Sequence, residues 1–215
     1  ADTRMDTASD HTAGDRHGDI RDEVRKLCAG FPGEYWRAHD RERSYPAEFV
    51  KALNDAGYLS ALIPEEYGGS GLPISAAAAI LEEIHHAGCN GAACHAQMYI
   101  MGTLLRHGSE AQKRRYLPGI ATGELRLQAF GVTEPSSGTD TSSIKTFARR
   151  DGDDYIINGQ KIWTSRAQYS DLMLLLARTT PKDNTTKRTE GRAVFMVEMR
   201  DALKAGLTIR PIRTM

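Results

Sequence analysis

The first part of the chain places apolar residues at helical spacing. Ile20, Val24, Leu27 and Cys28 recur at i, i+4, i+7 and i+8, which marks one face of an α-helix. The sequence Phe31-Pro32-Gly33 interrupts this pattern. Pro46 is favoured in a first helical turn, and it predicts a second helix that ends at Gly57. Residues 59–73 contain five glycines and prolines and predict a loop.

Three more helices are predicted between residues 75 and 120. Ser75 is expected to cap the first, with Glu82 and Glu83 in solvent and the apolar residues around them in the core. The other two are expected over residues 92–106 and 109–120, and Ser109 is the predicted cap of the second. Gly108 and Gly123 separate these pieces.

After Glu124 the period of the pattern changes from helical to two. Residues 125–130 alternate as a strand does, and Asp151-Gly152-Asp153 predicts a hairpin between strands 144–150 and 154–157. Asn158-Gly159 predicts a second turn that leads into a strand over 160–164. Further strands are expected over 172–177, 193–197 and 207–212, and residues 179–191 form an exposed polar loop. The fold class is therefore α+β, with a disordered leader (1–18), an N-terminal α-helical domain (19–124) and a middle β domain (125–215).

Composition and charge narrow the function classes. The 215 residues are 40% hydrophobic, and 28 basic residues balance 28 acidic ones, so no overall field attracts nucleic acid or an anionic membrane. No apolar run approaches the roughly 20 residues that a membrane span needs. The leader has neither a secretory nor a transit-peptide pattern, and the expected location is cytoplasmic.

The cysteines do not indicate a disulfide framework or a metal site. Cys28, Cys89 and Cys94 are an odd and sparse set, which fits a reducing compartment. Cys94 and His95 follow Cys89 in a segment with helical pattern, and the spacing matches no zinc template. We therefore expect no metal.

The segment richest in candidate chemistry is 130–140, with the sequence FGVTEPSSGTD. Small and hydroxyl-bearing residues after a strand let a flat or phosphorylated ligand approach the backbone closely. The same composition also suits an ordinary hydroxyl-rich turn, so this segment alone does not decide between a turn and a ligand site.

Four segments together resemble the acyl-CoA dehydrogenase family. Residues 131–140 are similar to its signature without a departure, and 158–165 (NGQKIWTS) resemble its NGxKxWIT strand. Residues 64–71 and 108–117 resemble its P-E-x-Y-G-G-x-G loop and G-x-x-x-Q-K-x-x-Y-L helix. The resemblance covers about residues 20 to 215. Ser165 stands where Thr is commoner, and Arg166-Ala167 stand where the family often has Asn-Gly.

The resemblance implies a fold and a set of site residues. The expected fold is a helical bundle followed by an antiparallel β-barrel or sandwich-like domain, with a C-terminal four-helix bundle absent from this chain. The catalytic Glu base is expected beyond Met215, and Glu134 is expected to be structural. The implied FAD ligands are Phe130, Val132, Thr133, Gly138, Thr139, Trp163, Thr164 and Ser165. The implied substrate contacts are Thr139, Gln97, Met98 and Met101.

The implied reaction is FAD-dependent α,β-dehydrogenation of an acyl-CoA thioester in fatty acid metabolism. Electrons are expected to pass to an electron-transfer flavoprotein, and the chain is expected to form a tetramer or a dimer. Because the adenosine half of the FAD site is expected elsewhere, we expect this chain alone to bind flavin poorly. Two alternatives stay open: another flavoenzyme of this fold (acyl-CoA oxidase, nitroalkane oxidase or flavin monooxygenase), or a partner subunit with a scaffolding role that lacks the base.

Overall fold

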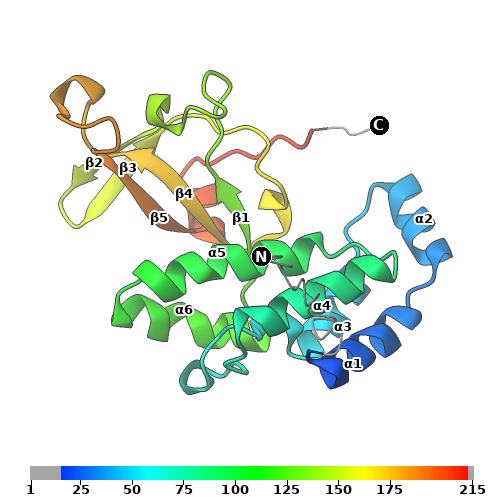
Figure 1. The fold of residues 1–215 in the computed structure, drawn as a ribbon. Helices are drawn as coiled ribbons and strands as arrows, with labels where there is room; N and C mark the ends of the chain where they lie inside the picture. Colours follow the sequence, from blue (N-terminus) through cyan, green and yellow to red (C-terminus); the bar gives the residue numbers. More distant parts are fainter. Residues whose placement is uncertain (1–15, 213–215) are drawn as a thin grey trace, which may run out of the picture.

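A computed structural model describes residues 16–212, with helices in the first part of the chain and a sheet in the second (Figure 1). Of the predicted leader, residues 1–15 lie outside the described residues, and Gly18 already begins a helix. The helices of the first part are α1 (Gly18–Ala29), α2 (Gly33–Glu42), α3 (Ala47–Asp55), α4 (Ile74–His86), α5 (Ala92–His107) and α6 (Glu110–Thr122).

Two of the three helix starts that the sequence predicts from capping or first-turn residues are confirmed. Pro46 precedes α3, and Ser109 caps α6 through a capping box with Gln112, as the sequence predicts. The predicted cap at Ser75 is wrong: Pro73 precedes α4, and Ser75 lies in its first turn with its hydroxyl 2.9 Å from His17 Nε2. Helix α2 is missing from the sequence prediction because none of its residues is buried.

The expectation that Glu83 is solvated is also wrong. Only 5% of this residue is exposed, and its carboxylate accepts hydrogen bonds from Arg21 Nη1 (2.7 Å) and Arg25 Nε (2.8 Å) on α1. Glu82 is exposed as expected, although it also pairs with Arg21. The ion pairs at Glu83 join α1 to α4.

The second part of the chain forms a mixed sheet of five strands. They are β1 (Leu127–Gly131), β2 (Phe147–Asp151), β3 (Asp154–Asn158), β4 (Leu172–Arg178) and β5 (Arg192–Glu198), followed by helix α7 (Met199–Lys204). Strand β4 is central: it runs parallel to β1, antiparallel to β5, and meets β2 at Arg178. The sheet is therefore not purely antiparallel, and its closure into a barrel stays a prediction. The Asp151-Gly152-Asp153 hairpin is confirmed between β2 and β3.

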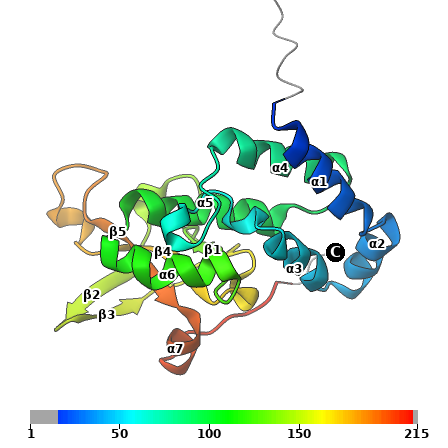
Figure 2. The ribbon, with the colours of Figure 1, turned by 90° about the horizontal axis from the view of Figure 1, so that it is seen from below.

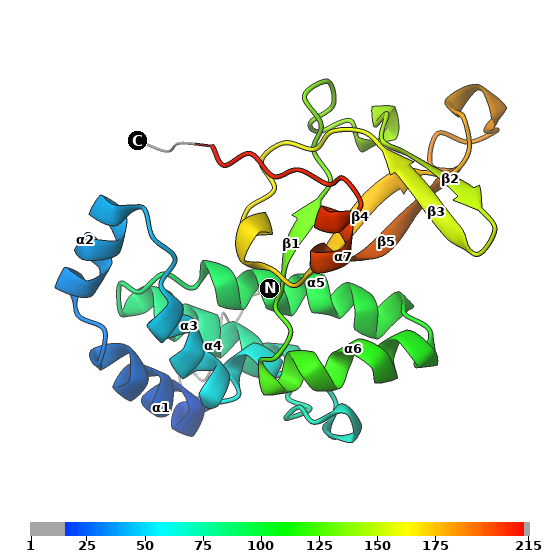
Figure 3. The same cartoon turned by 180° about the vertical axis from the view of Figure 1, so that it is seen from behind.

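The two faces of the sheet bury different partners. Leu172 and Leu174 pack against α5 and α6, whereas the alternate residues Met173 and Leu175 pack on the opposite face. Leu207 and Ile209 cover that opposite face, so residues 207–212 form an extended cover and not the strand that alternation predicts. Met199 at the start of α7 packs on the same face. Figure 2 shows α7 at the lower edge of the view, apart from α6, and Figure 3 shows the extended segment that leaves it.

Helix α5 lies between the helical layer and the sheet (Figure 1). Cys94 and Met98 on one side of α5 join the core of the helical part, whereas Ile100 and Leu104 join the core beneath the sheet. A helix that is buried on both sides fixes the position of the sheet relative to the helices.

Three further observations concern the remaining predictions. Cys28, Cys89 and Cys94 are free and buried, and burial raises the pKa of the Cys94 thiol to about 12. Between residues 16 and 212, no three His, Cys, Asp or Glu side chains are grouped so that they could hold a metal ion. Within the same range, no helix has both the length and the apolar character needed to cross a bilayer.

Candidate functional site

The 131–140 segment follows strand β1 and forms a tight turn over residues 134–137. The N–H of Glu134 donates to the carbonyl of Ser137 (3.0 Å), and the N–H of Ser137 donates back to Glu134 (3.1 Å). Pro135 and Ser136 are exposed at the tip of this turn. The turn reverses the chain immediately after the strand.

The side chain of Glu134 is inside the protein, with 3% of its side chain exposed. Its carboxylate accepts from the backbone N–H groups of Lys145 (2.6 Å) and Thr146 (2.9 Å) and from Lys161 Nζ (2.9 Å). Burial opposes the charged form, but hydrogen bonds from Thr146, Lys145 and Lys161 outweigh it and lower the pKa of Glu134 to about 2. Glu134 is therefore a structural anion, which favours the structural role that the sequence analysis gave it over a role as a base.

Lys161 brings the second motif against the first. Its ammonium donates to the carbonyl of Val132 (2.9 Å) as well as to Glu134, and the N–H of Ile162 donates to Thr133 (2.9 Å). The two motifs, which are about 30 residues apart in the sequence, thus lie side by side. Residues 160–164, which make these contacts, form an irregular segment and not the predicted strand.

Trp163 projects from this segment in an uncommon conformation. Its φ is +61°, in the left-handed region that side chains other than glycine rarely adopt, and the residue is 68% exposed. Strain of this kind costs on the order of 1–3 kcal/mol and is concentrated at functional sites. The structure therefore presents a large flat apolar side chain for contact with another molecule or segment.

The side chain of Asp140 holds the loop of residues 138–143 in place through its own hydrogen bonds. Its carboxylate accepts from the hydroxyls of Ser142 and Ser143 and from Arg188 Nη2 (2.9 Å). The hydroxyls of Ser142 and Ser143 and the guanidinium of Arg188 hold the pKa of Asp140 well below its ordinary value. This network leaves Gly138 and Thr139 exposed on the outer side of the loop.

The remaining predicted FAD ligands lie on the same two segments. Phe130, Val132 and Thr133 are half-buried at the end of β1, and Ser165 is exposed two residues after Trp163. The hydroxyl of Thr164 is buried and has no hydrogen-bond partner within the described part of the chain. The structure therefore brings together the residues that the sequence analysis selected from two separate motifs.

The predicted substrate residues on α5 are buried. Met98 belongs to the helical core and Met101 to the core beneath the sheet. Gln97 donates to the carbonyl of Leu59 and accepts from Gln128 Nε2 (3.4 Å). Their role in substrate binding stays a prediction, and the side chain of α5 that is exposed in this stretch is that of Tyr99.

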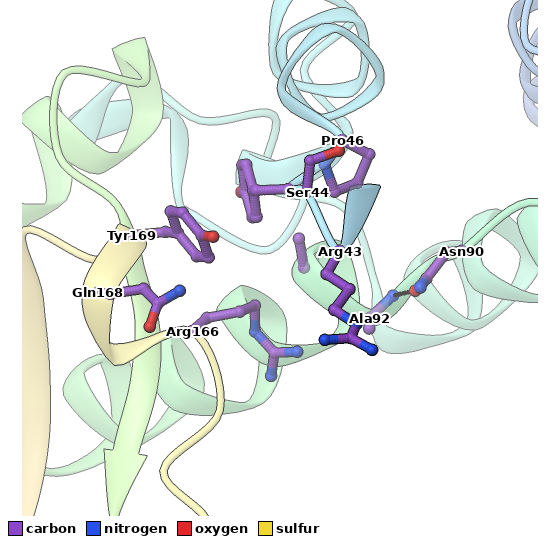
Figure 4. Close-up of a pocket in the computed structure, with 10 residues that line it drawn as sticks. Arg43, Ser44, Pro46, Asn90, Ala92, Arg166, Gln168 and Tyr169 are labelled. Carbon is purple, nitrogen blue, oxygen red and sulfur yellow. Dashed lines mark hydrogen bonds between the residues drawn. The ribbon is translucent and has the colours of Figure 1, made fainter. Parts of the chain in front are cut away.

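Sequence reasoning missed a pocket beside the Trp163 segment (Figure 4). It has a volume of about 220 Å³, and its walls come from the loop before α3, the start of α5 and the turn after Ser165. Its lining includes Arg43, Tyr45, Asn90, Arg166 and Tyr169. One residue in the sequence could have pointed to this pocket. It is Arg166, which stands where the resembled family often has Asn.

Comparison with known sequences identifies the family. Residues 14–124 match the sequence profile described as acyl-CoA dehydrogenase, N-terminal domain, and residues 129–215 match the profile of the acyl-CoA dehydrogenase middle domain. The chain belongs to the acyl-CoA dehydrogenase family. The two profiles together cover most of its length.

Individual acyl-CoA dehydrogenases agree with this result. The chain is 35% identical to the acyl-CoA dehydrogenase FadE26 of Mycobacterium tuberculosis over 193 residues, which are 90% of this chain and 46% of that protein. It is 32% identical to the glutaryl-CoA dehydrogenase of Desulfococcus multivorans over 85% of this chain and 46% of that protein. The chain thus spans about half the length of these curated relatives.

Two solved structures share the fold of this chain. The acyl-CoA dehydrogenase from Geobacillus kaustophilus superposes with a TM-score of 0.76 at 27% identity, over 85% of this chain and 48% of that one. The prolyl acyl carrier protein oxidase AnaB superposes with a TM-score of 0.77 at 28% identity, over 85% and 48%. Both are similar to this chain in its helical layer and its sheet.

The residues present fit a flavin. An exposed indole provides a flat apolar face, the buried Thr164 hydroxyl lacks a partner within residues 16–212, and open space surrounds the Cα of Gly138, since a Cβ built there meets no atom within 4 Å. A tricyclic ring needs this combination of a flat wall, hydrogen-bond donors and close approach to the backbone.

Proposed function

We propose that this chain supplies the flavin-binding wall and part of the acyl-CoA site of an FAD-dependent acyl-CoA dehydrogenase. The observation that supports this most strongly is Trp163, a strained and exposed indole fixed by Lys161 beside the 131–140 segment. The family of the chain supports the same assignment.

The residues have separate proposed roles. Trp163 covers one face of the ring, and the Ser165 hydroxyl donates a hydrogen bond near its reactive nitrogen. Phe130, Val132 and Thr133 contact the pyrimidine end, where hydrogen-bond donors stabilise negative charge. Gly138, Thr139 and Thr164 complete the FAD contacts, and Thr139 also contacts the thioester arm.

FAD, when bound, accepts the hydride that leaves the β-carbon of the acyl group. The protein orients the thioester and excludes water, and a carboxylate base removes the α-proton. We place that base outside this chain, in the half of the relatives' length that the chain does not match. Glu134 is unsuitable because Lys161 and two backbone N–H groups already occupy its oxygens.

The partners of the complete protein belong to the same proposal. We infer an acyl-CoA substrate, an electron-transfer flavoprotein as acceptor and a homo-oligomer. The chain is 29% identical to a chain in a structure described as an electron-transferring flavoprotein of Acidaminococcus fermentans, with a TM-score of 0.75, which supports the choice of acceptor.

Anaerobic titration of the natural protein that contains this chain tests the activity. We expect a straight-chain or branched acyl-CoA to bleach the oxidised flavin absorbance with a stoichiometry of about one. If no thioester bleaches a bound flavin, the proposal is wrong. Oxygen consumption in place of electron transfer to an electron-transfer flavoprotein assigns the protein to the oxidases of this fold.

A further inference from the structure

The pocket beside the Trp163 segment joins three parts of the chain that are distant in sequence. Arg43 and Tyr45 come from the loop between α2 and α3, Asn90 from the start of α5, and Arg166 and Tyr169 from the turn that follows Ser165. Figure 4 shows the side chains of Arg43 and Arg166 extending from different walls toward the same side of the pocket. The pocket therefore lies between the helical layer and the loop with the proposed flavin wall.

Positive charge in this pocket is not neutralised. Its ten lining residues include two arginines and no Asp or Glu. Within residues 16–212, neither guanidinium has a carboxylate oxygen within 4.0 Å. Arg166 makes one weak contact, from Nε to the carbonyl of Gln128 (3.3 Å), and its terminal nitrogens donate to no group in the described part of the chain.

The environment increases the effect of the charge on Arg166, whereas the side chain of Arg43 is exposed to solvent. Arg166 is half-buried, and burial lowers the pKa of its guanidinium although the nearby phenols of Tyr99 and Tyr45 oppose this change. The start of α5, a helix of 16 residues, also forms part of the wall through Ala92 and Ala93. Asn90 accepts from the N–H of Ala92 at 2.9 Å (Figure 4), which orders this wall. A half-buried cation near a helix N-terminus attracts an anion more strongly than the same cation in open solvent does.

Both arginines also have an unfavourable backbone conformation. The φ angles are +53° at Arg43 and +60° at Arg166, where glycine or asparagine is the usual residue. Such strain persists where the surrounding structure over-determines the conformation, and at Arg43 this is the C-terminal cap of α2, where the N–H of Arg43 donates to the carbonyl of Asp40. At Arg166, in the turn after Ser165, the guanidinium makes only the contact with Gln128 within the described residues.

The chemistry and the size of the pocket define a ligand class. A guanidinium binds a carboxylate or a phosphate with two parallel hydrogen bonds. A volume of about 220 Å³ accommodates a carboxylate and a few carbon atoms but is small for a nucleotide. The rings of Tyr45 and Tyr169 stack with centroids 4.7 Å apart and provide an apolar wall for those carbons.

We propose that the pocket between Arg43 and Arg166 binds the carboxylate of a small organic acid. The carboxylate has two sources: the far end of an acyl-CoA substrate, or a free dicarboxylate that binds beside the flavin site. The first source rests on the function proposed above, whereas the second does not.

The experiment compares adipoyl-CoA with hexanoyl-CoA, which differ only in a terminal carboxylate, and also uses free adipate. Dissociation constants are measured for the natural protein by calorimetry, and flavin bleaching by each thioester is followed in parallel. The variants are Arg166→Asn and Arg43→Asn, because asparagine tolerates the left-handed conformation and preserves the fold. Arg37→Asn is the matched control, since it removes one charge from exposed α2, where Arg37 pairs with Glu34.

A loss of at least tenfold in affinity for adipoyl-CoA in both pocket variants, with hexanoyl-CoA and the control unchanged, supports the substrate source. A tenfold loss for free adipate, with both thioesters unchanged, supports the free acid. The proposal is overturned if no probe with a free carboxylate binds more weakly to the pocket variants than to Arg37→Asn. If neither adipoyl-CoA nor hexanoyl-CoA nor any other thioester bleaches the flavin of the unmodified protein, the proposed function fails, and the adipate measurement still decides the carboxylate site.

Discussion

Lys161 Nζ lies 2.9 Å from the carboxylate of Glu134 and 2.9 Å from the carbonyl of Val132. The side chains of Lys161 and Glu134 are 9% and 3% exposed, so the pair is shielded from solvent. One ammonium group thus connects the two motifs from which the FAD ligands were predicted, and it fixes the backbone on both sides of Thr133.

Removal of this ammonium is expected to leave a buried carboxylate without its counter-charge. Lys161→Met should lower the free energy of unfolding by about 3–5 kcal/mol, as expected when one partner of a buried pair is lost. Lys51→Met is the control, because Lys51 forms an exposed pair with Asp55 and should change the value by less than about 1 kcal/mol. Urea denaturation measures the free energy of unfolding of both variants. If Lys161→Met and Lys51→Met lower it equally, the Lys161–Glu134 pair has no special structural role.

The low pKa of Glu134 predicts a specific pH dependence. Its pKa falls from an ordinary 4.5 to about 2 on folding, so the folded state favours the ionised form. The resulting stability is complete above pH 4.5 and is lost as the pH falls toward 2. The unfolding free energy of the wild type minus that of Glu134→Gln should therefore shrink by on the order of 2–3 kcal/mol over this range. A difference that does not change with pH would contradict the assignment of this shift to Glu134.

Adjacent glutamates on α4 should behave differently. Glu83 is buried and bonds to Arg21 and Arg25, whereas the side chain of Glu82 is 65% exposed. We expect Glu83→Gln to cost about 2–3 kcal/mol in thermal or urea unfolding, because both guanidiniums lose a charged partner. Glu82→Gln should cost less than about 1 kcal/mol. Similar values for the two variants would mean that the α1–α4 contact does not depend on Glu83.

The contrast between these two residues also shows what periodicity can predict. Helical spacing places α1, α3, α5 and α6 correctly, and the capping box at Ser109 fixes the start of α6. Spacing cannot distinguish a solvated Glu from one that pairs with arginines about 60 residues earlier, because that pairing depends on how the helices pack. The same limit applies to α2, whose Tyr35 and Trp36 pack against the helical core although none of its residues is fully buried.

In the β part, the hairpin was predictable and the sheet order was not. Asp151-Gly152-Asp153 specifies its own turn, but the parallel pairing of β1 with β4 depends on contacts across more than 40 residues. Leu207 and Ile209 alternate with polar residues as in a strand. In the structure they pack on the face of the sheet that contains Met173 and Leu175. The candidate site was predictable from two sequence motifs, whereas Arg43 and Tyr45 of the pocket had no local signal.

Gly138 provides a test of close ligand approach that is independent of folding. A Cβ at this position meets no protein atom within 4 Å, so Gly138→Ala should leave the free energy of unfolding within about 1 kcal/mol of the wild type. If the flavin lies against this backbone, the added methyl group should weaken FAD binding at least tenfold. Calorimetric titration with FAD and urea unfolding of the same variant separate the two effects. Unchanged FAD affinity would place the cofactor away from this loop.

The most direct test of the account is the affinity of the natural apoprotein for FAD when each tryptophan is changed separately. The chain contains two, Trp36 and Trp163, and Trp36 packs against the helical core and donates from Nε1 to the carbonyl of Phe31. We predict that Trp163→Ala weakens FAD binding at least tenfold at unchanged stability, whereas Trp36→Phe leaves the affinity unchanged. FAD binding of equal strength in wild type and Trp163→Ala would contradict a flavin ring stacked on this indole.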